Sequence, residues 1–135
     1  MFFENEAALR KWAASFALTL APGDVVLLSG PLGAGKTTFV RGALEGYGFH
    51  DVVRSPTFNL IQTFDTQPPV MHADLYRLKS AIGIGLEEYF ETHVCFIEWP
   101  DRAAGLFDGL NAWQVDIQFA DSGRAINVRR ADTGS

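Results

Sequence analysis

The chain has 135 residues, of which 47% are hydrophobic and 20% are charged, as is typical of one globular domain with a single core. Its formal net charge of −5 argues against a protein that grips nucleic acid mainly through its own electrostatic field. No apolar run reaches membrane-spanning length, and residues 1–6 lack the basic and apolar stretches of a signal peptide, so we expect no membrane contact and a cytoplasmic location.

The N-terminal third of the sequence predicts a helix, a buried strand and a second helix. Asn5 is suited to cap a helix that runs to about Leu18, in which apolar residues recur at helical spacing. Residues 24–29 are a nearly continuous apolar run, which is typical of a strand buried on both faces of a parallel sheet. The second helix is predicted over residues 36–47, because apolar residues again repeat on one face.

Between this strand and the second helix lies a stretch that fits the phosphate-binding loop formula, with two glycines four residues apart followed by Lys and Thr. Glycines let such a loop curl so that backbone N–H groups face phosphate oxygens, and the following helix adds its positive end. Lys36 is the expected cation for the β and γ phosphates, and the Thr37 hydroxyl is the expected Mg²⁺ ligand. A glycine-rich turn with a chance Lys-Thr pair is the alternative. The predicted nucleotide-binding residues here are Pro31, Leu32, Gly33, Ala34, Gly35, Lys36, Thr37 and Thr38.

The middle of the sequence predicts an antiparallel hairpin from residues 57–64 and 70–77, joined by a short linker. In the second run, His72, Asp74 and Tyr76 are expected to project from one face. Thr57 follows a Ser-Pro pair and is a candidate sensor of the γ-phosphate. Asp74 is a candidate to bind Mg²⁺ through water or to polarise the nucleophile, and spacing alone leaves both roles open. His72 by itself is interpreted as a hydrogen-bonded strand residue.

The C-terminal half predicts shorter elements. Residues 86–90 form an amphipathic helical turn whose glutamates face water. Residues 93–99 form an apolar strand that contains the single cysteine, Cys95, which we expect to be a buried reduced thiol. A short helix is predicted over residues 101–107. The alternating run from Trp113 to Phe119 and the return strand at 125–129 form a hairpin, which we expect to cover one face of the core.

Glu98, at the end of the predicted strand 93–99, supplies the acidic residue that a nucleotide site needs beside its loop. Asp is more usual at this place, but the longer Glu side chain reaches either a metal or a metal-bound water. The alternative is an ordinary surface carboxylate at a strand end.

Two motifs are absent from the sequence. No Asn-Lys-x-Asp segment is present to read guanine, and no arginine-rich lid of the kind found in small P-loop kinases is apparent. Arg54, Arg77 and Arg102 are scattered, and none is marked by its context as an arginine finger. An enzyme without an internal arginine finger is expected to hydrolyse ATP slowly until a partner completes the site.

Five segments, taken in order, resemble the TsaE (YjeE) family, which comprises small bacterial P-loop ATPases required for making threonylcarbamoyladenosine in tRNA. The segments are residues 30–42 (GPLGAGKTTFVRG), 55–60 (SPTFNL), 72–78 (HADLYRL), 85–89 (GLEEY) and 97–100 (IEWP). One departure is Pro31, where many relatives have an acidic residue, and it is expected to leave the phosphate contacts intact.

The resemblance implies an α/β fold: a P-loop NTPase-like mixed sheet, with a parallel core and antiparallel hairpins, flanked by helices on both faces. It implies one ATPase domain over residues 1–130, with a disordered tail at 131–135. It also implies binding of ATP and Mg²⁺, weak ATPase activity alone, and work with the TsaB–TsaD pair. In that system TsaD transfers the threonylcarbamoyl group, and the TsaE-like subunit uses ATP to reset the complex, which contacts the tRNA.

The family's functional positions fall here on six residues: Lys36, Thr37, Thr57, Asp74, Glu98 and Trp99. By this resemblance Lys36, Thr57, Asp74 and Glu98 are catalytic candidates, and Thr37 and Glu98 hold the metal. Trp99 lies beside the nucleotide, with a core or rim aromatic as the alternative, and residues 3–7 match the stretch that contacts adenine. Two other functions stay open: a small P-loop metabolite kinase, and a nucleotide-gated binding module without useful turnover.

Overall fold

The computed structural model describes residues 1–51, 60–76, 85–103 and 105–130, and it contains one seven-stranded sheet with strand order β1-β7-β6-β2-β5-β4-β3. The elements in chain order are β1 (Phe2–Phe3), α1 (Glu6–Ala17), β2 (Asp24–Ser29), α2 (Lys36–Gly46), β3 (Ile61–Phe64), β4 (Val70–Asp74), the 3₁₀ turn η1 (Leu86–Tyr89), β5 (Val94–Glu98), the 3₁₀ turn η2 (Pro100–Ala103), β6 (Asn111–Ala120) and β7 (Gly123–Arg130).

The centre of the sheet is parallel and its two sides are antiparallel. Strands β4, β5, β2 and β6 are parallel neighbours, whereas β3 joins β4, and β7 joins β6, in antiparallel hairpins. The carboxyl ends of the central strands therefore meet at one edge, where Glu98 pairs in register with both Leu28 and Asp74. The mixed sheet expected from the sequence is confirmed.

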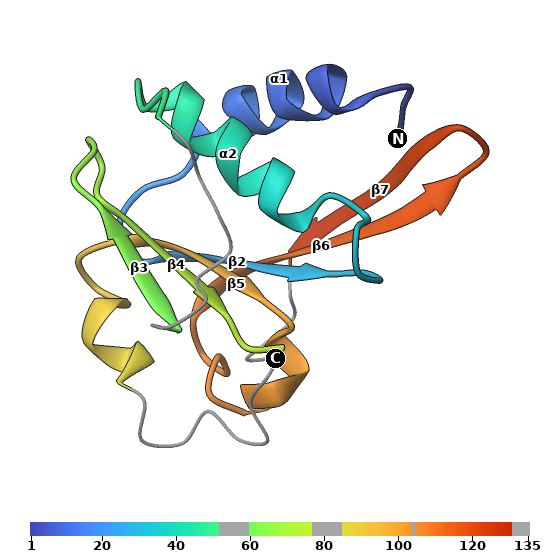
Figure 1. The fold of residues 1–135 in the computed structure, drawn as a ribbon. Helices are drawn as coiled ribbons and strands as arrows, with labels where there is room; N and C mark the ends of the chain where they lie inside the picture. The colour runs from blue at the N-terminus through green and yellow to red at the C-terminus, as the bar shows by residue number, and fades with distance from the viewer. Residues whose placement is uncertain (52–59, 77–84, 104, 131–135) are drawn as a thin grey trace.

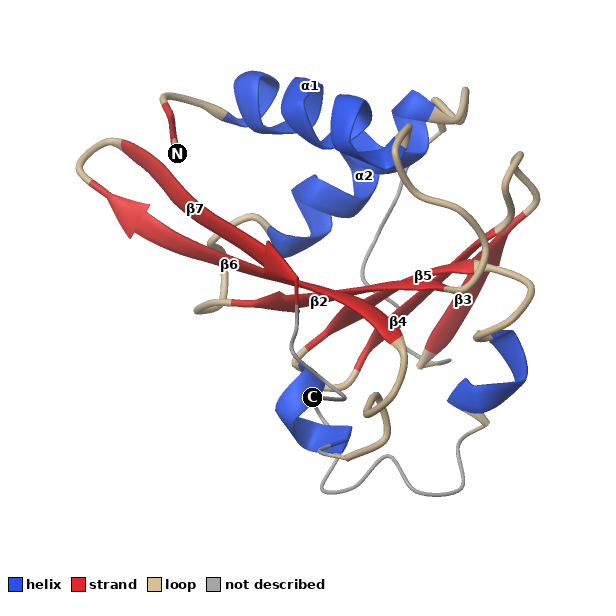
Figure 2. Cartoon of the chain, turned by 180° about the vertical axis from the view of Figure 1, so that it is seen from behind, coloured by secondary structure: helices blue, strands red, loops and turns tan. Residues whose placement is uncertain are grey.

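Helices cover both faces of the sheet, as expected, although those on the second face are short. Helices α1 and α2 lie on one face, and the turns η1 and η2 lie on the other (Figures 1 and 2). Strand β2 is buried on both faces, because Val26 and Leu28 join the core under the helices while Val25 and Leu27 join the core on the opposite side. No helix among the described residues has the length and apolar character needed to cross a membrane.

The prediction that the final hairpin covers one face of the core is wrong. Strand β6 instead pairs in parallel with β2 over six residues, Asp24–Ser29, and β7 extends the sheet further. The alternation of β6 fits this arrangement, since Val115 and Ile117 are fully buried under α1 and α2. Pairing with β6 also satisfies the edge of β2, whose buried backbone groups need hydrogen-bond partners.

The other predicted elements are found with shifted ends. The hairpin β3–β4 is shorter than expected, and the first residues of its first strand, 57–59, lie outside the described residues, as does the tail at 131–135. The turn η1 buries Leu86 and Phe90 and exposes Glu87 and Glu88, as its pattern predicts. The predicted helix at 101–107 is only the turn η2. Cys95 is a buried free thiol, and burial raises its pKa to about 12.

Helix α1 begins where the sequence predicts, and it packs closely on α2. The Asn5 side chain caps it by accepting a hydrogen bond from the Ala8 N–H at 2.9 Å. At Gly42 of α2, an added Cβ would lie 2.5 Å from the Arg10 carbonyl oxygen of α1. The small residue on α2 therefore lets the two helix backbones approach.

Replacing Gly42 with alanine is expected to lower the free energy of unfolding by about 1–3 kcal/mol, because the added methyl overpacks the α1–α2 contact. Urea unfolding followed by circular dichroism measures the change. The exposed Lys11 on α1 provides a control, since Lys11→Ala should stay within about 0.5 kcal/mol of the wild type. Equal stability of the Gly42→Ala variant and the wild type would contradict the close packing.

Candidate nucleotide site

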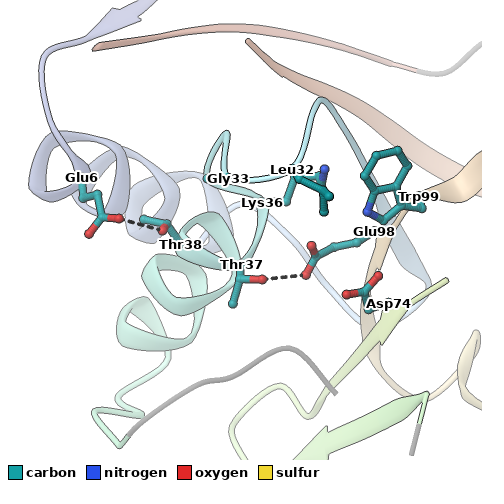
Figure 3. Close-up of a pocket in the computed structure, with 10 residues that line it drawn as sticks. Glu6, Leu32, Gly33, Lys36, Thr37, Thr38, Asp74, Glu98 and Trp99 are labelled. Carbon is teal, nitrogen blue, oxygen red and sulfur yellow. Dashed lines mark hydrogen bonds between the residues drawn. The ribbon is translucent and has the colours of Figure 1, made fainter. Parts of the chain in front are cut away.

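A pocket of about 250 Å³ lies at the edge where β2, β4 and β5 end, beside the loop that precedes α2 (Figure 3). The residues that line it are Glu6, Leu32, Gly33, Gly35, Lys36, Thr37, Thr38, Asp74, Glu98 and Trp99. The structure thus brings together most of the predicted site residues from separate parts of the chain. Thr57 lies outside the described residues.

Two of the predicted nucleotide-binding residues do not line this pocket. Pro31 is exposed, and Ala34 is fully buried in the core under the helices. Their backbone shapes the loop instead, since the Ala34 N–H donates to the Pro31 carbonyl at 3.2 Å. Glu6 of α1 belongs to the stretch 3–7 that the resemblance places near adenine, and it lines the pocket. Its carboxylate accepts a long hydrogen bond of 3.5 Å from the Thr38 hydroxyl.

Two glycines of the loop are required by its geometry. Gly30 has φ +140°, and a Cβ there would lie 2.1 Å from the Ile117 carbonyl oxygen of β6, so the loop packs against the sheet only with glycine. Gly35 has φ +120° and immediately precedes helix α2, a backbone conformation that other residues rarely adopt. The glycine pattern in the sequence is thus explained by these two positions.

Lys36 holds its amine inside the loop. Its Nζ donates to the Gly30 carbonyl and, at 3.2 Å, to the Pro31 carbonyl, and it lies 4.0 Å from the centroid of the Trp99 ring. Burial lowers the pKa of Lys36, and this effect is opposed by the negative charges of Glu98, Asp74 and Asp101. Lys36 is only 5% exposed, so its charge is shielded from water more than that of a surface lysine.

Glu98 is the buried centre of a hydrogen-bonded group. Its Oε2 accepts a hydrogen bond from the Thr37 hydroxyl at 3.1 Å and lies 2.6 Å from His72 Nε2. Glu98 is 3% exposed and His72 is fully buried. A buried carboxylate is costly unless it is hydrogen-bonded, and here both partners bind the same oxygen. The alternative of a surface carboxylate at Glu98 is therefore excluded.

The contact between His72 and Glu98 was not predicted from the sequence. His72 lies opposite Phe96 in the β4–β5 register, so Glu98, two residues further along β5, projects from the same face. The period-2 pattern does place His72 and Asp74 on one face, as expected. Tyr76 departs from it, since β4 ends at Asp74, where the side-chain Oδ1 accepts the Tyr76 N–H at 3.1 Å.

Asp74 and Trp99 complete the wall opposite the loop. Burial, chiefly, and the charge of Glu98 raise the pKa of the half-buried Asp74 carboxyl, while its hydrogen bond from the Tyr76 backbone lowers it. Trp99 adopts a left-handed backbone with φ +61°, which is rare for a large residue. Its ring contacts that of Tyr76 with centroids 4.8 Å apart. This backbone directs the ring over Lys36, which favours the site position for Trp99 over a core position.

The oxygen atoms of Thr37 and Glu98 fit a magnesium ion that is shared with phosphates. Mg²⁺ prefers oxygen ligands and is usually held by one or two protein groups plus phosphate oxygens, and these two side chains bring oxygens within 3.1 Å of one another at the pocket. In the described ranges no group of three or more His, Cys, Asp or Glu side chains is arranged to hold a metal.

Replacing His72 with leucine is expected to lower the free energy of unfolding by about 1–3 kcal/mol, because the buried Glu98 loses a hydrogen-bond donor. His72→Gln, which keeps a donor, should recover part of the loss. Urea unfolding again gives the values. The exposed His50 serves as the control, and equal losses for His50→Leu and His72→Leu would argue against the buried contact.

Comparison with known proteins assigns the family. The family model described as "Threonylcarbamoyl adenosine biosynthesis protein TsaE" matches residues 3–129. The chain is 46% identical over 99 residues to the tRNA threonylcarbamoyladenosine biosynthesis protein TsaE of Bacillus subtilis, a match that spans 71% of this chain and 61% of that protein. It is 38% identical over 125 residues to TsaE of Treponema pallidum, which spans 87% and 90% of the two chains.

A solved structure agrees with this result. The crystal structure of YdiB from Bacillus subtilis superposes with a TM-score of 0.78 at 33% identity, over 97% of this chain and 83% of that one. The family match covers nearly the whole described chain, including the loop before α2 and the ends of β4 and β5. The chain therefore belongs to the TsaE family of tRNA threonylcarbamoyladenosine biosynthesis proteins.

Proposed function

We propose that this chain binds ATP with Mg²⁺ in the pocket beside the loop, and that it hydrolyses ATP slowly on its own. The observation that carries the proposal is the convergence of Lys36, Thr37 and Glu98 on one buried site, from the loop and from the end of β5. This combination of a cation, a hydroxyl and a carboxylate is the one that P-loop NTPases use on phosphates.

Each side chain has a role in the proposed reaction. The loop N–H groups and the positive end of α2 bind the β and γ phosphates, and Lys36 adds its buried charge. Thr37 and Glu98 hold the metal, and His72 fixes the Glu98 carboxylate. When bound, magnesium neutralises part of the phosphate charge. Asp74, with its raised pKa, orients the attacking water, and Trp99 forms the wall against Lys36.

We further propose that the chain acts with TsaB and TsaD in the cytoplasm and contacts tRNA only through that complex. TsaD transfers the threonylcarbamoyl group, and ATP turnover by this chain resets the pair. Family membership supports this role. The pocket also supports it, since Lys36 is the only cationic residue among those described that line it, and a partner can add the positive charge that the γ-phosphate needs during hydrolysis.

Equilibrium binding of ATP, with and without Mg²⁺, tests the first part of the proposal. Isothermal titration of the purified chain should give one ATP site that weakens when EDTA removes the metal. ATP that is radiolabelled on its γ-phosphate then separates hydrolysis from phosphate transfer, because an ATPase releases all of the label as inorganic phosphate. Label appearing on a small acceptor would favour the metabolite kinase, and absence of ATP binding would contradict the proposal.

A further inference from the structure

Arg124 of β7 binds the outside of the phosphate-binding loop, although it lies about ninety positions later in the chain. Its Nε donates to the Ala34 carbonyl at 2.8 Å, and its Nη2 donates to the Gly33 carbonyl at 3.5 Å. Its Nη1 donates to the Gly123 carbonyl of its own strand at 3.0 Å. The guanidinium thus joins the final hairpin to two successive peptides of the loop.

The sheet fixes the position of this arginine. Its guanidinium carbon lies 4.5 Å from the centre of the Phe119 ring of β6, a stacking distance that favours a planar cation. Residue 124 also pairs in register with Phe3 of β1 and with Phe119. Arg124 therefore offers its donors from a rigid frame with strands on either side.

The contact has a direct consequence for the loop. A trans peptide directs its C=O and N–H to opposite sides, so a bond that holds the Ala34 carbonyl toward Arg124 turns the Gly35 N–H away from it. Gly35 lines the candidate site, and the site needs loop N–H groups that face phosphate. Gly33 and Gly35, with φ +79° and +120°, give the loop freedom but cannot by themselves hold one shape.

We propose that Arg124 is a positioning residue that sets the peptide orientation of the phosphate-binding loop, and so raises its affinity for nucleotide phosphates. The inference rests on the proposed ATP site. It extends the site beyond the loop to the last hairpin, and it makes the hairpin's place in the sheet a requirement for tight nucleotide binding.

The test is the ATP dissociation constant of Arg124→Ala and Arg124→Lys, with the thermal unfolding midpoint of each variant measured without nucleotide. Loss of the two hydrogen bonds to the loop should raise the Kd of Arg124→Ala for ATP about tenfold, which corresponds to about 1.4 kcal/mol of binding free energy. Arg124→Lys should recover only part, because an ammonium lacks the fork that reaches two carbonyls. Arg129→Ala is the control, since Arg129 is exposed on the same strand and should keep the wild-type Kd.

Each outcome decides the inference. Weaker ATP binding by Arg124→Ala at an unchanged unfolding midpoint supports it, whereas a wild-type Kd overturns it. If Arg124→Ala is unfolded, Arg124→Lys decides: a folded lysine variant with weaker binding supports the inference, and one with wild-type binding overturns it. A wild-type Kd for ATP in Arg124→Lys also overturns the inference that the paired contacts with two carbonyls are required. If the wild-type chain itself binds no ATP, the proposed function fails, which is a distinct result.

Discussion

Replacing Lys36 with alanine is expected to weaken ATP binding about tenfold or more, because the change removes a charge-assisted phosphate contact worth about 1.5–3 kcal/mol. The amine lies inside the loop, bound to the Gly30 and Pro31 carbonyls and covered by Trp99. Isothermal titration with ATP and Mg²⁺ measures Kd. Burial lowers the pKa of Lys36, which means that the folded protein disfavours the charged amine. Removing the Lys36 side chain should therefore change the folding stability much less than the affinity for ATP.

Two further variants make the Lys36 result specific. Lys36→Met keeps the apolar stem but not the charge, so it should bind as weakly as Lys36→Ala. Lys11→Ala removes an exposed lysine of α1 far from the loop in sequence, and it should bind ATP as the wild type does. Unchanged Kd in Lys36→Ala would contradict the assignment of the pocket to phosphates.

Glu98→Gln is expected to slow ATP hydrolysis about a hundredfold or more, since loss of even an outer partner of a metal typically costs about 10–100-fold. Glutamine has nearly the same shape and keeps one oxygen that can accept the hydrogen bonds of Thr37 and His72, but it lacks the negative charge that a metal ligand supplies. Phosphate release at saturating ATP, across a Mg²⁺ titration, measures the loss. A higher Mg²⁺ requirement should accompany it.

The matched control for Glu98 is Glu91→Gln, which removes an exposed carboxylate just before the same strand and should leave hydrolysis unchanged. Asp74→Ala belongs in the same series, because Asp74 faces the pocket across the β4–β5 register. If neither Glu98→Ala nor Asp74→Ala changes the ATPase rate in the assembled complex, the catalytic interpretation fails and a nucleotide-gated binding module is favoured.

The sequence predicted the parts of the site that depend on local pattern. The spacing of glycines, Lys36 and Thr37 identified the loop, and a buried strand ending in Glu98 identified the carboxylate. Both the loop and Glu98 lie at one pocket, because parallel strands, which appear in the sequence as apolar runs, end together at one edge of the sheet. Asp74 reached the same edge through the period-2 alternation of its strand.

The parts that were missed depend on register between distant segments. The hydrogen bond between His72 and Glu98 follows from the β4–β5 pairing. The hydrogen bonds from Arg124 to the loop carbonyls depend on the pairing of β6 with β2 and of β7 with β6. The same pairing explains why the last hairpin extends the sheet instead of covering it. Strand β1 is only two residues long, so its sequence pattern is too short to predict a strand. Its place beside β7 depends on contacts between distant residues, such as the 2.9 Å hydrogen bond from the Met1 amine to the Ile126 carbonyl.

We propose that this chain is a slow ATPase that TsaB and TsaD activate, and one comparison of phosphate release rates tests this proposal. Phosphate release is measured for the chain alone, for TsaB with TsaD, and for all three, each with ATP and Mg²⁺ and with Glu98→Gln as the inactive control. We expect the three-protein mixture to turn over ATP faster than the sum of its parts, and we expect Glu98→Gln to remove the increase. Rates that simply add, with no complex detected by gel filtration, would contradict it.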